Sequence, residues 1–137
     1  ERARMRPSTL QQLGKQMPSY VILKTPLDLT GDADTERYRL AIAAALQDPG
    51  VDMLAVIPLL QVPGLSGDII EVITEAKGTK PLVVIAGGGE YTETLKKPLE
   101  EAGIPTFSYP ERAIAGLRAL WDHSQRSRRP PAGAKAV

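Results

Sequence analysis

The sequence predicts an α/β domain with a mostly parallel sheet and helices on both of its faces. Two unbroken apolar runs, at residues 53–57 and 81–86, are typical of strands covered on both sides, as in parallel sheets. Segments with apolar residues at helical spacing alternate with these runs. Strands that alternate with helices favour a parallel sheet with right-handed crossovers, so both observations predict the same architecture.

Length and composition exclude several classes of protein. The chain has 137 residues, about one domain's worth, with 42% hydrophobic, 24% charged and 4% aromatic residues, which indicates an aliphatic core. A net charge of +1 gives no electrostatic argument for nucleic acid, and the absence of cysteine excludes disulfides and thiol chemistry. With no apolar run near the roughly 20 residues of a membrane helix, and no apparent signal peptide, we expect a cytoplasmic protein without a membrane partner.

The amino-terminal third is expected to hold a short helix, an extended run and a long helix. Residues 7–13 predict the short helix, and residues 20–23 predict the extended run. The long helix is expected over residues 34–47, with Asp32 and Asp34 both suitable as N-caps. Its apolar residues at helical spacing predict an inward stripe of Tyr38, Ala41, Ile42, Ala45 and Leu46.

The remainder predicts three more helices and a short strand at residues 104–107. The helices are expected at residues 67–76, at residues 90–102 and from Pro110 onward, and Pro98 should kink or split the second of them. Their inward residues are expected to be Ile69, Ile70, Val72 and Ile73, then Tyr91, Leu95, Leu99 and Ala102, then Ala113, Ile114, Leu117, Leu120 and Trp121. We therefore divide the chain into an N-terminal segment (1–18), a folded domain (19–123) and a flexible basic tail (124–137).

Three loops are expected at the carboxyl ends of the strands, where ligands gather in such sheets: residues 27–34, 58–66 and 86–91. In the first loop, Gly31 is expected to allow a backbone angle that other residues resist. Asp28 could orient donors near a bound group, although an Asx-type turn is favoured. Thr30 and Gly31 could offer a hydroxyl and an N–H to an oxyanion, or could only form the turn.

The triple glycine Gly87, Gly88 and Gly89 follows an apolar run and opens a helix, which is a suitable context for phosphate. It lacks the spacing of a dinucleotide site and a Walker lysine, so close backbone packing against a partner domain, or a contact with the active-site loop from the side, is favoured. Asp28, Asp32 and Asp34 lack the pattern of a calcium loop, and we expect no metal site. His123 is expected at the surface, and so are the basic residues near the end of the chain, Arg126, Arg128, Arg129 and Lys135.

Several segments together resemble the NDP-forming acyl-CoA synthetases. The run from Pro26 to Asp34 with Glu36-Arg37-Tyr38 resembles the NP-[VL]-D-L-T-G-D-A segment of that family. The triple glycine and two further segments match in order and spacing, Glu101-Ala102-Gly103-Ile104-Pro105 and Pro110-Glu111-Arg112-Ala113. In that family this piece is the flavodoxin-like ligase–CoA domain, which is similar to the C-terminal domain of the succinyl-CoA synthetase β subunit.

The resemblance implies a three-layer α/β/α fold and an acid–thiol ligase reaction, in which acyl-CoA, ADP and phosphate form acid, CoA and ATP. A phosphohistidine on another domain carries the phosphoryl group. This chain would then contribute Asp28, Thr30, Gly31, Asp32 and the triple glycine to the phosphohistidine and acyl pocket, with no catalytic residue of its own. ADP or ATP, CoA and Mg²⁺ would be cofactors of the full enzyme, and CoA-binding and ATP-grasp domains or subunits would be partners.

Two departures from the family pattern bear on activity. The family's first strand and glycine-rich helix are missing, and Thr25 stands where the family usually has Asn. We therefore expect the isolated chain to bind no cofactor by itself and to be inactive. The alternative hypothesis is a non-catalytic interaction module that keeps only the fold and forms homo-oligomers through its sheet edge. The sequence leaves open the acyl substrate and the preference for ADP or GDP.

Overall fold

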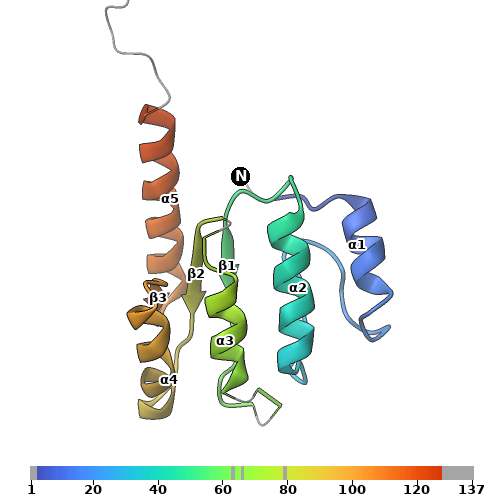
Figure 1. The fold of residues 1–137 in the computed structure, drawn as a ribbon, viewed down its shortest axis with the longest axis horizontal. Helices are drawn as coiled ribbons and strands as arrows, with labels where there is room; N and C mark the ends of the chain where they lie inside the picture. Colours follow the sequence, from blue (N-terminus) through green and yellow to red (C-terminus); the bar gives the residue numbers. More distant parts are fainter. Residues whose placement is uncertain (1–2, 63, 66, 79, 128–137) are drawn as a thin grey trace, which may run out of the picture.

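Three parallel strands form one sheet with helices on both faces (Figure 1). This computed structural model describes residues 3–62, 64–65, 67–78 and 80–127. The helices are α1 (Pro7–Gly14), α2 (Thr35–Gln47), α3 (Asp68–Glu75), α4 (Glu90–Glu101) and α5 (Pro110–Ser127). The strands, which lie in sequence order across the sheet, are β1 (Leu54–Val56), β2 (Leu82–Ile85) and β3 (Thr106–Phe107). The predicted flavodoxin-like α/β architecture is confirmed.

The central strand β2 supplies side chains to both layers of the core. All four of its residues are buried. Leu82 and Val84 pack on the side of α2, α3 and α4, whereas Val83 and Ile85 pack against Ala113 of α5. Because neighbouring side chains of a strand point to opposite faces, this unbroken apolar run requires a helical layer on each side.

The helix α2 begins and ends as the sequence predicts. The Asp34 side chain accepts the Arg37 backbone N–H at 2.8 Å, which satisfies one of the free donors of the first turn. Tyr38, Ala41, Ile42 and Ala45 are buried, and the partly buried Leu46 packs against the same core.

Among the described residues, no helix is long and apolar enough to cross a membrane.

Asp48 at the end of α2 ties the amino-terminal segment to the domain. Its carboxylate accepts the backbone N–H groups of Arg6 at 2.8 Å and Gly50 at 2.7 Å. Its backbone oxygen accepts the Lys80 ammonium at 2.6 Å. A hydrogen bond from Thr9, followed by the N–H groups of Arg6 and Gly50, holds the pKa of the Asp48 carboxyl below its ordinary value. The segment before α1 is thus anchored by a charged acceptor.

The expected extended run at residues 20–23 is not a strand of the sheet. It makes one isolated antiparallel bridge, between Ile22 and Asp28. The backbone N–H groups on either side of this bridge are satisfied locally, because Val21 donates to Pro18 and Lys24 donates to Ile22, each at 3.0 Å. The segment therefore folds as consecutive turns rather than as a ladder.

The expected inward faces of the last two helices are partly wrong. On α4, Tyr91 is 60% exposed, and the buried residues are Thr92, Lys96 and Leu99. On α5, only Ala113 is buried, and Leu117 is partly buried. The other apolar residues of that stripe are exposed: Ile114, Leu120 and Trp121. Leu120 and Trp121 are exposed because α5 continues beyond the end of the sheet, where its later turns have no layer to cover (Figure 1). Ile114 lies near the start of α5, next to the buried Ala113, and faces solvent rather than the sheet.

Three smaller expectations also differ. Of the two outcomes expected at Pro98, a kink or a split, the split does not occur, because one continuous helix, α4, passes through this residue. Helix α5 extends to Ser127, so the first four residues of the expected tail are helical, and the rest of that tail lies outside the described residues. In β1, Leu54 and Ala55 are only partly buried, because this strand lies at the edge of the sheet rather than between two neighbours.

We predict that Leu99→Ala lowers the free energy of unfolding by about 2–5 kcal/mol, because Leu99 is fully buried between α4 and the sheet. The matched control is Ile114→Ala, which removes a side chain that is 56% exposed. This substitution should change the free energy of unfolding by less than about 0.5 kcal/mol. Urea unfolding of both variants measures the difference. Equal losses of unfolding free energy in the two variants would contradict the exposed position of Ile114 on α5.

Candidate functional site

The bend formed by residues 27–34 is held in a strained conformation. The Asp28 Oδ1 atom accepts the Thr30 N–H at 3.0 Å, which is the Asx-type turn that the sequence favours. Thr30 has a φ of 69°, in the left-handed region that β-branched residues avoid. Gly31, for which the unusual angle was expected, has no positive φ, so that expectation is wrong by one residue.

The Arg37 side chain braces this bend from the first turn of α2. Its Nη1 atom donates to the Leu29 oxygen at 2.9 Å and to Thr30 Oγ1 and Asp32 Oδ1, each at 3.0 Å. The guanidinium also lies 5.8 Å from the ring centre of Tyr20, whose hydroxyl donates to Asp32 at 2.5 Å. Hydrogen bonds from Arg37, then Thr30 and Tyr20, hold the pKa of the Asp32 carboxyl far below its ordinary value.

Neither Arg37 nor Tyr20 was expected at the site. A signal for Arg37 was available, because side chains in the first turn of a helix lean back toward the segment that precedes it. Arg37 follows the N-cap Asp34 by three residues and therefore covers the bend. Tyr20 lies in the irregular turns before the motif, where no periodic pattern predicts a contact.

The triple glycine is shaped by contacts inside this chain. A Cβ at Gly88, which has a φ of +159°, would overlap the Gln61 Nε2 atom and the Thr92 side chain. Gln61 donates to the Gly87 oxygen at 3.1 Å and to Thr92 Oγ1 at 2.7 Å, so it fills the space that the glycine leaves. Gly89, the N-cap of α4, has nothing within 4 Å of an added Cβ.

A continuous set of contacts places the two bends on the same edge of the sheet. The Ala33 oxygen lies 3.8 Å from an ideal Cβ on Gly64, in the loop after β1. Gln61, in the same loop, is bonded to Gly87. Ala33 and Ala86 also belong to one buried core. The loop after β1 therefore lies near the aspartate bend at Gly64 and is bonded to the glycine bend through Gln61.

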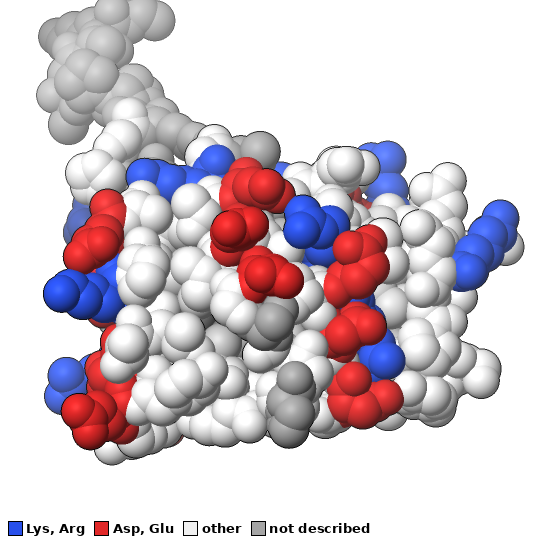
Figure 2. Space-filling view, turned by 60° about the horizontal axis from the view of Figure 1, so that its bottom comes forward, with Lys and Arg blue, Asp and Glu red and all other residues white. Residues whose placement is uncertain are grey.

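This edge of the molecule carries many acidic side chains (Figure 2). The helices that begin here have acidic residues in their first turns: Glu36 in α2, Asp68 and Glu71 in α3, Glu90 and Glu93 in α4, and Glu111 in α5. Carboxylates in the first turn offset the positive end of a helix. A free anion at this edge would therefore require added positive charge.

One positive charge at the edge is already engaged. The Lys96 side chain of α4 is 6% exposed, and its ammonium donates to Glu93 at 2.7 Å and to Ser108 Oγ at 3.0 Å. Ser108 follows β3 and leads into α5. The contacts of Lys96 fix α4 against the start of α5.

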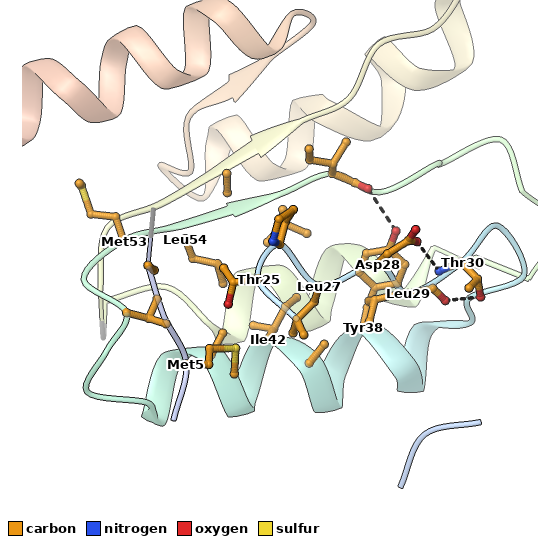
Figure 3. A pocket seen from close by; sticks show the side chains of 18 of the residues that line it. Met5, Thr25, Leu27, Asp28, Leu29, Thr30, Tyr38, Ile42, Met53 and Leu54 are labelled. Atoms are coloured by element: carbon orange, nitrogen blue, oxygen red, sulfur yellow. Dashed lines mark hydrogen bonds between the residues drawn. The ribbon is translucent and has the colours of Figure 1, made fainter. Parts of the chain in front are cut away.

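A pocket of ≈ 590 Å³ extends along β1 from the aspartate bend (Figure 3). Asp28, Thr30 and Gly31 line one end of it, and Tyr38 donates to the Ile57 oxygen there at 3.1 Å. Burial raises the pKa of the Tyr38 hydroxyl. Asp32 and the three glycines are not among the residues that line this pocket, so the predicted site residues divide between the pocket and the rim.

Within the described ranges, no group of three histidine or acidic residues could hold a metal ion. His123 and Arg126 are exposed near the end of α5. The other basic residues named for the tail, Arg128, Arg129 and Lys135, lie outside the described residues.

Comparisons with known proteins show that the chain is homologous to one segment of ADP-forming acetate–CoA ligases. No protein-family model matches it. The relatives are ADP-forming acetate–CoA ligases. The chain is 39% identical over 121 residues to the ADP-forming acetate–CoA ligase I subunit alpha of Pyrococcus furiosus, and 32% identical over 126 residues to its ligase II counterpart.

These matches cover 85% and 86% of this chain but 26% and 27% of the relatives, so the chain spans about a quarter of the length of the curated relatives it matches.

The solved dinucleotide-forming acetyl-coenzyme A synthetase 1 of Ca. Korarchaeum cryptofilum is similar to this chain in fold. It has a TM-score of 0.73 and 29% identity, and the match covers 88% of this chain and 28% of that chain. A second structure of that protein is in complex with phosphate and ADP.

We predict that Gly88→Ala destabilises the protein by about 1–3 kcal/mol, because the added methyl group must displace Gln61 or Thr92. Gly89→Ala, one residue further on, adds the same methyl group in open space and should be nearly neutral. Thermal unfolding of the two variants measures the effect. A neutral Gly88→Ala would contradict the packing described for this bend.

We predict that Arg37→Ala speeds backbone hydrogen exchange in the 27–34 bend by about tenfold or more, because the bend loses the charge-assisted hydrogen bonds that Arg37 donates to Leu29 and Asp32. Arg39→Ala is the control, since Arg39 lies on the same helix but pairs with Glu36 and Glu75 instead. Exchange measured by NMR separates the two variants. If both raise exchange in the bend alike, then general fraying of α2 is responsible and Arg37 is not a specific brace.

Proposed function

We propose that this chain acts as the ligase–CoA domain of an ADP-forming acyl-CoA synthetase and forms one wall of the pocket in which phosphohistidine, phosphate and the acyl group meet. The whole reaction converts acyl-CoA, ADP and phosphate to acid, CoA and ATP. The histidine comes from another domain, and the chain itself supplies no catalytic residue.

The observation that carries this proposal is the strained bend at the carboxyl edge of the sheet. A threonine in the left-handed region costs about 1–3 kcal/mol, and such strain clusters at binding and catalytic sites. The bend is also held by Asp28, Arg37 and Asp32 in a way that a simple connection between elements does not require. Residues in this state are pre-organised to receive another group.

The acidic edge supports a role for partner domains in binding phosphate. A phosphate placed against the first-turn carboxylates of α2, α3 and α4 would be repelled unless a cation accompanied it. We propose that Mg²⁺ carried by the nucleotide, or basic groups from the CoA-binding and ATP-grasp domains, supply that charge. The structural relative that binds phosphate and ADP supports these ligands for the complete enzyme.

A domain exchange tests the proposal. The matching segment of the Pyrococcus furiosus ligase I alpha subunit is replaced by this chain, and the chimera is assayed with its natural partner for ATP formation from acetyl-CoA, ADP and phosphate. We expect ATP formation, and we expect Asp28→Ala in the chimera to lower kcat by about tenfold or more, because the bend loses its Asx turn. Asp52→Ala, an exposed residue at the other end of β1, is the matched control.

A chimera that assembles with its partner but forms no ATP would overturn the proposal and favour the alternative, a non-catalytic module that keeps the fold. If the Asp28 and Asp52 substitutions lower kcat equally, the bend is not part of the proposed site.

A further inference from the structure

We propose that Gln61 is a positioning residue of the site at the carboxyl edge. Its side chain fixes the glycine bend relative to the loop after β1, and the reaction depends on that alignment. The inference rests on the proposed function, because it concerns the same edge of the sheet. It adds to the site a residue that was not expected there from the sequence.

The pairing of β1 with β2 fixes the two following loops only where they begin. The last paired residues of these strands are Val56 and Val84. Gln61 and Gly87 both lie beyond this pair, in the loops that follow. The ladder therefore does not set the position of one loop relative to the other, and contacts between the loops must do so.

The side-chain amide of Gln61 joins the two loops. Its Nε2 atom donates to the Gly87 oxygen at 3.1 Å and to Thr92 Oγ1 at 2.7 Å. The Gly87 oxygen can only accept, so the nitrogen end of the amide must face the bend. Thr92 is 1% exposed and lies in the first turn of α4. One amide group thus holds both the bend and the start of the helix that follows it.

The glycine bend is shaped around this amide. Three consecutive glycines give a segment little stiffness of its own, because glycine has the widest backbone freedom of any residue. A Cβ at Gly88 would overlap Gln61 Nε2 and the Thr92 side chain, whereas a Cβ at Gly89 would meet nothing within 4 Å. Without the amide, Gly88 would gain space to move, and the bend would lose its fixed geometry.

The loop that bears Gln61 also reaches the aspartate bend. The Ala33 oxygen lies 3.8 Å from an ideal Cβ on Gly64 of this loop. Gln61 therefore sets the position of the glycine bend relative to both parts of the proposed pocket. A misplacement of about 1 Å can lower a rate by about 100-fold. The Gln61 side chain is exposed, so its loss should affect alignment far more than stability.

The test uses the chimera with the Pyrococcus furiosus ligase I alpha subunit described above. Gln61→Met keeps the length of the side chain and removes both donated hydrogen bonds. We expect kcat to fall about tenfold with KM for acetyl-CoA and phosphate unchanged, because alignment acts on the reacting groups rather than on substrate binding. Gln11→Met, the same substitution at an exposed position of α1, is the matched control and should leave kcat unchanged.

A double-mutant cycle tests whether Gln61 acts through Thr92. Thr92→Val removes the acceptor and keeps the branched shape of the side chain. It should also lower kcat, and the variant with both substitutions should be no slower than Gln61→Met alone, because both remove the same interaction.

NMR relaxation of the 137-residue chain measures the cause directly. The amides of Gly88 and Gly89 should have lower order parameters in Gln61→Met than in the parent chain, since the bend loses the group around which it is shaped. Gln11→Met should leave these order parameters unchanged.

An active chimera in which Gln61→Met has the kcat of the parent would overturn this inference alone, and so would unchanged order parameters in the bend. A raised KM for phosphate with unchanged kcat would overturn it as well, because Gln61 would then contact the substrate directly. Losses of kcat that multiply in the double variant would show that the two residues act independently, which also contradicts it. A parent chimera that forms no ATP would overturn the proposed function, and this inference with it.

Discussion

The parallel ladder through β2 is the constraint on which the rest of the molecule depends. Its four buried residues direct side chains alternately into two helical layers, and its backbone pairs on both sides, with β1 and β3. Since the three strands run in the same direction, the loops that follow β1 and β2 leave the same edge. The loop after β1 then contacts both the aspartate bend and the glycine bend, which are separated by more than fifty residues in the sequence.

The two bends are stabilised by different means. Charge-assisted hydrogen bonds from Arg37 hold the aspartate bend, whereas a steric fit of Gly88 against Gln61 and Thr92 holds the glycine bend. Neither arrangement leaves a cation free to neutralise an anionic ligand. The acidic first turns around them increase this shortage of positive charge. An anion at this edge would therefore need positive charge supplied from outside the two bends.

Most elements could be predicted from the sequence because their signals are local. The N-cap Asp34, the buried stripe of α2 and the apolar run of β2 each follow from spacing. The outward face of α5 could not be predicted in this way, because a helical pattern does not report how far the sheet beneath it extends. The brace from Arg37 was missed because periodicity describes which face is buried and not which loop a polar side chain covers. The Thr30 angle was assigned to Gly31 because residue preferences favour glycine there.

The conformation of Thr30 has a consequence for how such sequences diversify. Glycine or asparagine would adopt a φ of 69° with less strain, so selection for stability alone would tend to replace this threonine. A homologue of this domain that has lost its function should therefore tend to acquire glycine or asparagine at this position. Under the proposed function, threonine at this position would therefore mark lineages in which the bend still forms part of the site.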